Sequence, residues 1–301
     1  MQHHIAILTG GTSSEREIAL QSAAHVQEVL ASHFTIKLYD FPQDLERFLQ
    51  ERASIHVAIP LFHGVGGEDG TIQGFLQTLN IPFLFSGVEA QAIGMNKAVT
   101  KDLFTRCGVK TAPYQVIESS NILPLFTKPC VLKPLNTGSS VGISIANDEI
   151  SYQLGIDEAF RHSKHILIED YIPGREFTVA VIETATRLTA LPVIEIKSKH
   201  AFFDLESKYD PALADEVCPA EISSELSDTL KKIAIQAHEA IGAKHLSRTD
   251  FIVDEHGVPW TLEINTIPGQ TKNSLLPKAV RASGLSFSEI YRVWIEKELK
   301  K

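Results

Sequence analysis

Residues 261–271, TLEINTIPGQT, place a carboxylate and a carboxamide two positions apart in an apolar, β-branched setting. Side chains along a strand alternate between its two faces, so Glu263 and Asn265 are predicted to share one face. The segment LSRTDFIVD alternates in the same way and puts Arg248 and Asp250 on one face. The turn residues DEHG between the two segments predict a hairpin, which brings Asp250 opposite, or nearly opposite, Glu263.

Two carboxylates opposed across a hairpin repel each other and therefore need a positive partner. One candidate is Arg248, and the other is a metal cation. Oxygen ligands from Asp250, Glu263 and Asn265 suit Mg²⁺ far better than zinc. Because Mg²⁺ with few protein ligands completes its shell with water and substrate phosphates, the hairpin predicts a magnesium–nucleotide site. The hairpin alone leaves open a surface ion-pair ladder in which Arg248 is the only partner.

Candidate phosphate-binding lysines occur earlier in the chain. Lys133 ends the apolar segment CVLKP, and a glycine-serine loop follows it. Backbone N–H groups of such a loop can hold phosphate, with Lys133 as the point charge. Lys97, near the start of a predicted helix, is a second candidate. These residues favour the nucleotide interpretation of the hairpin.

The same loop, GSSVG at residues 138–142, also matches the G-x-S-x-G nucleophile elbow of hydrolases. An elbow requires a strand that leads directly into the turn and a helix that leaves it. Here PLNT intervenes, and VGISIA leaves as a predicted strand. The sequence therefore disfavours a hydrolase.

A further glycine-rich loop, LFHGVGGEDGTIQG, carries His63 as a candidate binding group. A lone histidine is more often structural, which is the alternative here. The chain contains neither H-E-x-x-H nor a Cys/His cluster, and this disfavours a zinc enzyme.

Three units are predicted to position these groups. Residues 1–94 alternate strands such as HIAIL and IHVAIPLFH with helices such as GTIQGFLQTLN, which predicts a parallel α/β sheet. The turn GGTSSE is not G-x-G-x-x-G, so a dinucleotide fingerprint is absent. Residues 95–176 open with a helix that Gly108 ends, and strands with few helices between them follow, as in α+β folds. Residues 177–301 contain a polar stretch at about 199–216, predicted to be a lid, then a helix and the hairpin.

The bulk composition excludes several classes of protein. The net charge of −9 and the absence of a Lys/Arg block disfavour nucleic acid and anionic membranes as partners. The 3 cysteines are odd in number and far apart, which indicates a reducing cytoplasm. We expect no signal peptide, since the first residues lack a cationic region, and no membrane helix, since no apolar run is long enough.

Six segments together resemble the D-alanine–D-alanine ligases of the ATP-grasp family. They are GGTSSEREIAL, HGVGGEDGTIQG, SGVEAQAIGMNK, LKPLNTGSSVGIS, LIEDYIPGREFTVA and LEINTIPGQTKNSLLP, and they span nearly the whole chain in order. The resemblance implies a Rossmann-like N-terminal domain followed by a two-subdomain ATP-grasp fold. It also implies a reaction: ATP phosphorylates the carboxylate of one D-alanine, and the amine of a second D-alanine attacks the acyl phosphate.

The resemblance implies nucleotide-binding roles for eight residues. The phosphates would contact Lys97 and Lys133, with Ser140 and Lys208 also at the nucleotide. Adenine would lie against Glu169 and the backbone near Asp170 and Ile172, and the ribose against Glu176. Asp170 stands where relatives often have lysine, which should matter little because its contacts there are partly through the backbone.

The remaining implied roles concern metal and amino acids. Two Mg²⁺ ions, replaceable by Mn²⁺, would bind Asp250, Glu263 and Asn265. An oxyanion hole would consist of Arg248 and the Gly269 N–H. The amino-acid sites would involve Glu15 at the first ammonium, His63 near its carboxylate, and Ser274 and Leu275 at the second carboxylate. The lid residues Lys208 and Tyr209 would close toward Ser139.

Two alternatives to the D-alanine–D-alanine ligase remain open at this point. One is a depsipeptide ligase of the D-alanine–D-lactate type, although the Lys208-Tyr209 pair in the lid favours D-alanine as second substrate. The other is a non-catalytic nucleotide-binding protein. The family resemblance also implies a homodimer.

Overall fold

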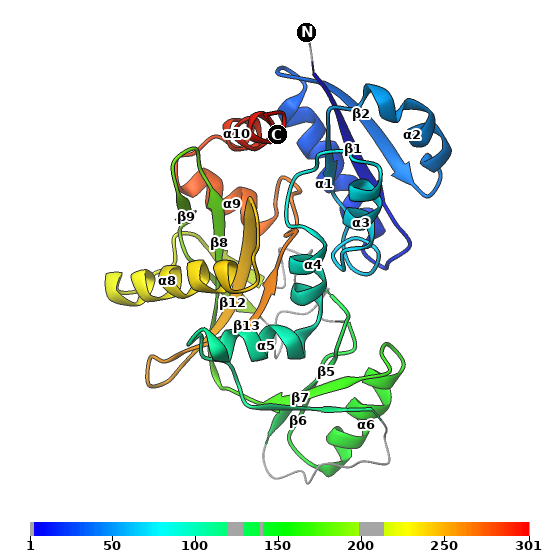
Figure 1. Cartoon of the computed structure of the whole chain (residues 1–301). Coiled ribbons are helices and arrows are strands. Elements are labelled where there is room, and N and C mark those ends of the chain that lie inside the picture. Colours follow the sequence, from blue (N-terminus) through cyan, green and yellow to red (C-terminus); the bar gives the residue numbers. More distant parts are fainter. Residues whose placement is uncertain (1–2, 119–128, 139–140, 199–213, 301) are drawn as a thin grey trace.

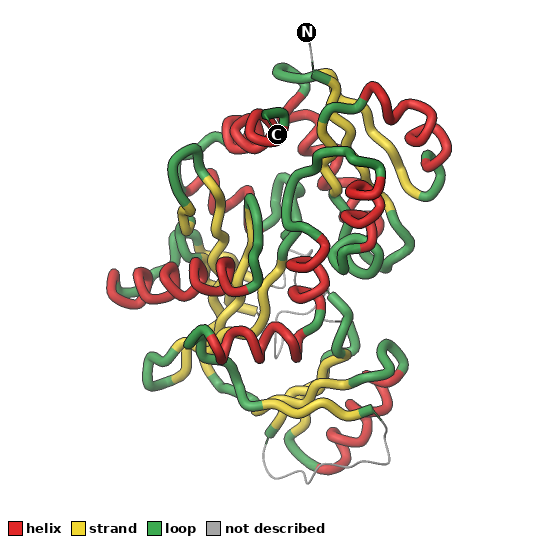
Figure 2. The backbone as a smooth tube through the Cα atoms, in the orientation of Figure 1, coloured by secondary structure: helices red, strands yellow, loops and turns green. Residues whose placement is uncertain are grey.

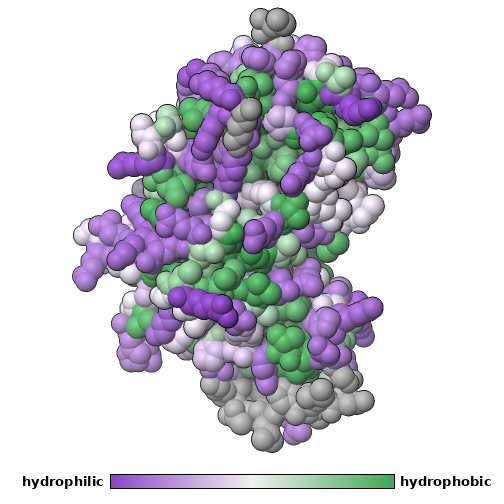
Figure 3. Space-filling model, viewed as in Figure 1, coloured by the Kyte–Doolittle hydropathy of each residue, from purple (hydrophilic) through white to green (hydrophobic). Residues whose placement is uncertain are grey.

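The structure, a computed structural model, describes residues 3–118, 129–138, 141–198 and 214–300. Figure 1 shows three regions, each built on its own β-sheet, and Figure 2 shows the strands of the three sheets separated by helices and loops. Figure 3 shows a largely hydrophilic face with smaller hydrophobic patches. Among the described helices, none has the length and apolar character needed to cross a membrane.

The N-terminal region is the predicted parallel α/β unit. Its sheet has the order β2-β1-β3, and both pairs are parallel. The strands are β1 (His4–Gly10), β2 (Thr35–Phe41) and β3 (Val57–Pro60). The helical elements are α1 (Arg16–Leu30), α2 (Leu45–Glu51), the 3-10 helix η1 (Arg52–Ser54), α3 (Thr71–Thr78) and α4 (Val88–Met95). Strand β1 is buried from Ile5 onward, as its unbroken apolar sequence predicts for a strand covered on both faces.

The second region is an antiparallel sheet of order β4-β7-β5-β6. Its strands are β4 (Tyr114–Ile117), β5 (Cys130–Pro134), β6 (Ser144–Ala146) and β7 (Ile166–Asp170). Helix α5 (Lys97–Arg106) leads into it, and Gly108 follows with φ of +74°, a left-handed conformation that ends the helix as predicted.

Helix α6 (Glu149–Phe160) was not among the expected elements of this region, which was predicted to contain few helices. Its inward positions are Tyr152, Gly155, Ile156 and Ala159, which follow helical spacing. However, Leu154 lies on the solvent side with 65% of its surface exposed and blurs that pattern. A capping box between Asp148 and Ser151 begins the helix.

The third region is a six-stranded sheet of order β11-β10-β8-β12-β13, with β9 paired to β8. Its strands are β8 (Gly174–Glu183), β9 (Leu188–Ala190), β10 (Ile194–Ser198), β11 (Ala214–Val217), β12 (Leu246–Asp254) and β13 (Pro259–Asn265). The helices are α8 (Ser224–Ala240), α9 (Leu275–Ala282) and α10 (Phe287–Glu298).

The predicted hairpin is present as strands β12 and β13. Asp250 pairs with Glu263, and Arg248 pairs with Asn265. A β-bulge follows Asp250, and bulges bend a strand and re-aim the side chains next to them. Pro259 is the first residue of β13, a position that needs no ladder N–H.

Two expected boundaries differ from the sheet structure. The predicted boundary after residue 176 falls inside β8, because the chain changes sheet at residues 171–173, between β7 and β8. The predicted lid at 199–216 overlaps β11, which pairs with β10, and its residues 199–213 lie outside the described ranges. Helix α10 also crosses regions, since it packs on α1 and its Trp294 belongs to the same core as Ile5 (Figure 1).

Candidate active site

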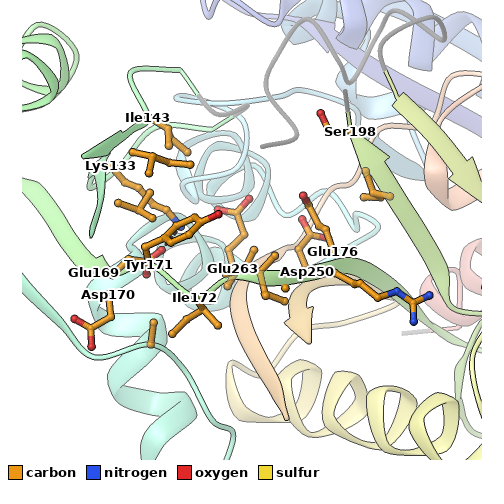
Figure 4. Close-up of a pocket in the computed structure, with 18 of the residues that line it drawn as sticks. Lys133, Ile143, Glu169, Asp170, Tyr171, Ile172, Glu176, Ser198, Asp250 and Glu263 are labelled. Atoms are coloured by element: carbon orange, nitrogen blue, oxygen red, sulfur yellow. Dashed lines mark ion pairs between the residues drawn. The ribbon is translucent and has the colours of Figure 1, made fainter. Parts of the chain in front are cut away.

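A cavity of ≈ 370 Å³ lies between the second and third sheets, within the size range of small-molecule sites. Strands β5 and β7 supply Lys133, Glu169 and Asp170, and the segment after β7 supplies Tyr171 and Ile172. Glu176, Asp250 and Glu263 come from β8, β12 and β13. Figure 4 shows Lys133 and Glu169 on one side, Glu176 and Asp250 on the other, and Glu263 between them. The structure therefore brings together most of the predicted nucleotide-binding residues.

The inner wall of this cavity carries a buried charge cluster. The Glu169 carboxylate forms ion pairs with Lys133 and, at 2.8 Å, with Lys101. Burial raises the pKa of the Glu169 carboxyl, but the positive charges of Lys133 and Lys101 lower it by a larger amount. The pKa of Glu169 therefore lies below its ordinary value. Burial lowers the pKa of the Lys133 ammonium, yet Glu169 and Glu263 raise it above its usual value. Both charges are thus stable in the interior.

Lys101 was not predicted as a site residue. It lies one helical turn after Lys97 on α5, and both side chains are buried. The sequence does show two lysines four residues apart, which places them on one face of the helix. Burial of that face would have pointed to a partner for Lys101, since lysine is rarely buried without one.

Asp170 and Glu176 occupy different places in the cavity. In Figure 4 the Asp170 carboxylate points away from Lys133 and Glu263. Glu176 lies on the same side as Asp250. Next to Glu176, Arg175 Nε donates to Glu195 Oε1 at 2.7 Å and closes the wall of the cavity.

The hairpin presents its polar groups at the inner end of the cavity. Arg248 grips Asp250 through two hydrogen bonds, Nε to Oδ1 at 2.9 Å and Nη2 to Oδ2 at 2.7 Å. Thr178 Oγ1 donates to Asp250 Oδ1 at 2.5 Å. The side chains of Arg248 and Asp250 are each 11% exposed, so they form a buried ion pair and not the surface ion-pair ladder.

The donor set of the hairpin fits a hard divalent cation. Asp250 and Glu263 face each other in register, and Asn265 lies two pairs further along the ladder, opposite Arg248. Asn265 Oδ1 accepts the Ile267 N–H at 2.9 Å, which orients this oxygen and leaves it one lone pair. Among the described residues no three His, Cys, Asp or Glu side chains form a complete cage. Two carboxylates and an amide oxygen match a magnesium ion that takes its remaining ligands from phosphate and water.

A second, smaller cavity of ≈ 80 Å³ adjoins the first, and Glu263 lines both. All three regions contribute to its wall, which contains both predicted site residues and residues that were not predicted. The lining residues are Glu15, His63, Glu68, Gly94, Met95, Lys97, Thr137, Gly138, Arg248, Glu263, Ile264, Asn265, Thr266 and Gly269. Lys97 Nζ lies 4.0 Å from Glu263 and donates to the Thr137 carbonyl at 2.6 Å. Glu263 therefore forms part of the wall of both cavities.

His63 and Glu68 are both buried in this second cavity and both shifted toward neutrality. Burial lowers the pKa of His63 to about 4, so its imidazole is uncharged at neutral pH. Burial and the nearby Glu15 raise the pKa of Glu68 to about 8. The Glu68 carboxyl accepts the Gly64 N–H at 2.6 Å. Glu68 was not predicted as a site residue, although it lies five positions after His63 in the same glycine-rich loop.

Close backbone approach explains two glycines near Glu15. A Cβ at Gly138 would lie 3.1 Å from Glu15 Oε2, and one at Gly64 would lie 3.0 Å from the same oxygen. The Gly64 backbone is also left-handed, with φ of +73°. These glycines let the loops from β3 and β5 reach the Glu15 carboxylate.

Ser274 and Leu275 lie beside the second cavity and do not line it. Ser274 precedes α9, its Oγ accepts the Thr271 N–H at 3.1 Å, and it would meet a Cβ at Gly269 at 3.0 Å. Leu275 is the first residue of α9 and is buried. Four predicted residues, Ser139, Ser140, Lys208 and Tyr209, lie outside the described ranges.

Comparison with known proteins finds the same family over the whole chain. Residues 92–296 match the family described as D-ala D-ala ligase C-terminus. A D-alanine–D-alanine ligase from Desulfotalea psychrophila is 41% identical over 307 residues, covering 99% of this chain and 95% of that protein. The structure of D-alanyl-alanine synthetase A from Vibrio cholerae has a TM-score of 0.88 at 25% identity, covering 100% and 99% of the two chains. The D-alanine–D-alanine ligase from Bacillus anthracis complexed with ATP has a TM-score of 0.85 at 27% identity, covering 99% and 98%.

Proposed function

The chain belongs to the D-alanine–D-alanine ligase family, and we propose which of its residues perform each part of the family's reaction. The protein is an ATP-grasp enzyme that joins two D-alanine molecules into D-alanyl-D-alanine for peptidoglycan synthesis, through a D-alanyl phosphate. It uses ATP and a divalent metal. The observation that carries our assignment of roles is the shared wall at Glu263, which joins the two cavities.

For the nucleotide, we propose that the second and third sheets clamp ATP between them. Glu169 accepts the adenine amino group, with the backbone of Asp170 and Ile172 beside the ring, and Glu176 binds the ribose. Lys97 and Lys133 bind the phosphates, because they are the buried ammonium groups that line the two cavities among the described residues. We propose that Ser140 and Lys208 add further contacts to the nucleotide.

For the metal, we propose that Asp250, Glu263 and Asn265 hold two Mg²⁺ ions, and that Mn²⁺ can replace them. A divalent cation bound there offsets the negative charge of the triphosphate during phosphoryl transfer. Arg248 then has a second task besides its bond to Asp250. Its guanidinium and the Gly269 N–H donate to the oxyanion that forms when the amine attacks the acyl carbon.

For the amino acids, we propose that the smaller cavity holds the first D-alanine. Glu15 binds its ammonium group, and neutral His63 lies near its carboxylate. One oxygen of that carboxylate attacks the γ-phosphorus, and ADP leaves. The unprotonated amine of the second D-alanine then attacks the acyl carbon, the bond from this carbon to the phosphate oxygen breaks, and the proton lost by the nitrogen leaves with the hydrogen phosphate.

The second D-alanine requires residues on the far side of Gly269. We propose that Ser274 and Leu275 receive its carboxylate, and that Tyr209 and Ser139 complete the closed site. We also propose that the enzyme is a homodimer and that it acts in the cytoplasm, where its substrate ATP is made.

The test of this function is a coupled measurement of phosphate release and product mass. Purified enzyme with MgATP and D-alanine should release one phosphate per dipeptide of the mass of D-alanyl-D-alanine. The same assay with D-lactate as second substrate should yield little depsipeptide. Phosphate release that ignores D-alanine, or a product that requires D-lactate, would contradict the assignment.

A further inference from the structure

We propose that Lys101 is a positioning residue for nucleotide binding: it is the permanent counterion of Glu169 and thereby leaves Lys133 free to turn to the triphosphate. The inference rests on the proposed function, in which Glu169 binds adenine and Lys133 binds phosphate. Lys101 itself does not line the cavity and touches no substrate.

The contacts of Lys101 fix its ammonium group in one place. Its side chain is 2% exposed, and Nζ lies 2.8 Å from Glu169 Oε2. Nζ also donates to Thr111 Oγ1 at 2.5 Å and to the Ala112 carbonyl at 3.5 Å. The ammonium group therefore makes two hydrogen bonds and one close ion pair. We therefore expect the Lys101 ammonium group to keep this position when the nucleotide binds.

Glu169 depends on both of its lysines. Oε1 forms its ion pair with Lys133, while Oε2 lies against Lys101 and has no hydrogen bond of regular geometry within the described residues. The trio carries two positive charges and one negative charge in a buried place. Glu263 also attracts Lys133, and Lys133 lines the cavity that a triphosphate would enter.

Only one of the two lysines can serve the phosphates. Lys133 lines the cavity beside Glu263, and Figure 4 shows it there with Glu169. If Lys133 turns toward phosphate, the Glu169 carboxylate keeps Lys101 as its partner. Without Lys101 the same movement would leave a buried carboxylate uncompensated, which is strongly unfavourable. Lys101 thus lowers the free energy needed to move the Lys133 ammonium group from Glu169 to the phosphates.

Lys101 also connects the adenine wall to the metal hairpin. Thr111 Oγ1, which accepts from Lys101, donates to the Thr261 carbonyl at 3.0 Å. The Thr261 N–H donates to the Lys110 carbonyl at 2.8 Å. Thr261 lies on β13 two residues before Glu263, whereas Glu169 lies on β7. Hydrogen bonds through Thr111 therefore link the ammonium group that neutralises Glu169 to the strand that carries Glu263.

The test is a double-mutant cycle with Lys101→Met, Glu169→Gln and the double variant, measured as KM for ATP and for D-alanine. Lys101→Met should raise the KM for ATP by about tenfold or more, the scale of a lost hydrogen bond to a charged group. The KM for D-alanine should change by less than about twofold, since Lys101 lies outside that cavity. In the Glu169→Gln background, the further change to Met should raise the KM for ATP by less than about twofold, because no carboxylate remains to compensate.

A matched control is Lys244→Met, which breaks the 2.5 Å pair between Lys244 and Glu298 away from both cavities. It should lower Tm and leave both KM values unchanged. If Lys101→Met does not fold, the double variant compared with Glu169→Gln alone still decides: an ATP KM more than about tenfold higher in the double variant would overturn the inference.

The cycle separates this inference from the proposed function. An unchanged KM for ATP in Glu169→Gln would refute the adenine role of Glu169, and with it the role of Lys101. A raised KM in Glu169→Gln together with an unchanged KM in Lys101→Met would refute only the role of Lys101. Equal losses from Lys101→Met in both backgrounds would mean that Lys101 acts independently of Glu169, which also contradicts the inference.

Discussion

Arg248 has two acceptors in this account. The structure pairs its guanidinium with Asp250, and the proposed function adds a hydrogen bond to the oxyanion of the reaction. The guanidinium is planar and has five donors, so two hydrogen bonds to Asp250 leave others for a second acceptor. A lysine at this position would lack that geometry. Arg248 can thus orient a metal-binding carboxylate and still meet charge that develops in the transition state.

Replacing Arg248 by alanine should therefore affect the chemical step. We expect kcat to fall by at least about a hundredfold, the scale for a lost oxyanion donor. The KM for ATP should stay nearly unchanged, because Thr178 Oγ1 still donates to Asp250. Steady-state kinetics with D-alanine and MgATP measure both. Arg161→Ala is a suitable control, since that side chain, at the C-cap of α6, is 73% exposed and pairs with Glu158. Activity within a few fold of wild type in Arg248→Ala would show that the oxyanion is stabilised by other groups.

Glu68 makes a prediction about pH and stability. Its folded pKa of about 8 lies above the ordinary value of 4.5, so the folded state binds more protons than the unfolded state between these pH values. Its contribution to stability is therefore full below pH 4.5 and is lost as the pH rises toward 8.

The variant Glu68→Gln removes this titration and keeps an acceptor for the Gly64 N–H. Its stability relative to wild type should rise with pH over this interval, by at most about 1.4 kcal/mol per pH unit. Urea unfolding at several pH values measures the difference. Parallel stability curves for the two proteins would mean that the Glu68 carboxyl ionises normally.

The placement of site residues was predictable where a short segment determines it and unpredictable where contacts between distant elements do. The alternation in β12 and β13 sufficed to place Arg248, Asp250 and Glu263 on one face. Lys101 and Glu68 were missed because their importance arises from partners on other elements, Glu169 in one case and Glu15 in the other. No local pattern reports such contacts.

At the scale of elements, the site depends on how closely β8 approaches β12. These strands pair along their whole length, from Gly174 opposite Asp254 to Ile182 opposite Leu246. A Cβ at Gly174 would lie 2.3 Å from the Val253 carbonyl oxygen, which is backbone and cannot move aside alone. Gly174 thus permits the register that sets Glu176 beside Asp250.

The substitution Gly174→Ala should destabilise the protein through this clash. We expect a loss of about 1–3 kcal/mol in the free energy of unfolding, the usual cost of an overpacked site. The matched control is Gly74→Ala, where an added Cβ meets only Val88 Cγ2 at 3.7 Å, an ordinary contact, and the backbone φ is not positive. Urea denaturation of both variants checks the prediction. Equal free energies of unfolding for the two variants would mean that β8 can move away from β12 without destabilising the protein.

The elements themselves were predicted unevenly, for physical reasons. The parallel N-terminal sheet and the hairpin follow from uninterrupted apolar runs and strict alternation. Helix α6 was missed because Ile150 and Leu154 are apolar yet exposed, so the helical stripe is not distinct. The end of the second unit was placed inside β8 because EFTVAVI reads as one strand whichever sheet it joins.

At the scale of the whole molecule, the site exists only because three regions meet. The smaller cavity takes Glu15 and His63 from the first region, Lys97 and Gly138 from the second, and Arg248 from the third, together with their neighbours. Helix α10 strengthens this assembly, because it returns from the third region to the core beneath α1. An amphipathic sequence indicates that such a helix buries one face, but it does not indicate against which partner.

The central claim is that a metal held by the β12–β13 hairpin joins the nucleotide to the amino acid at Glu263. The direct measurement is calorimetry of MgATP binding to wild type and to the double variant Asp250→Asn/Glu263→Gln, which removes both charges with little change of shape, alongside an assay of dipeptide synthesis. We expect MgATP affinity to fall by about tenfold or more and dipeptide formation to cease. Undiminished affinity with normal dipeptide synthesis would contradict the account.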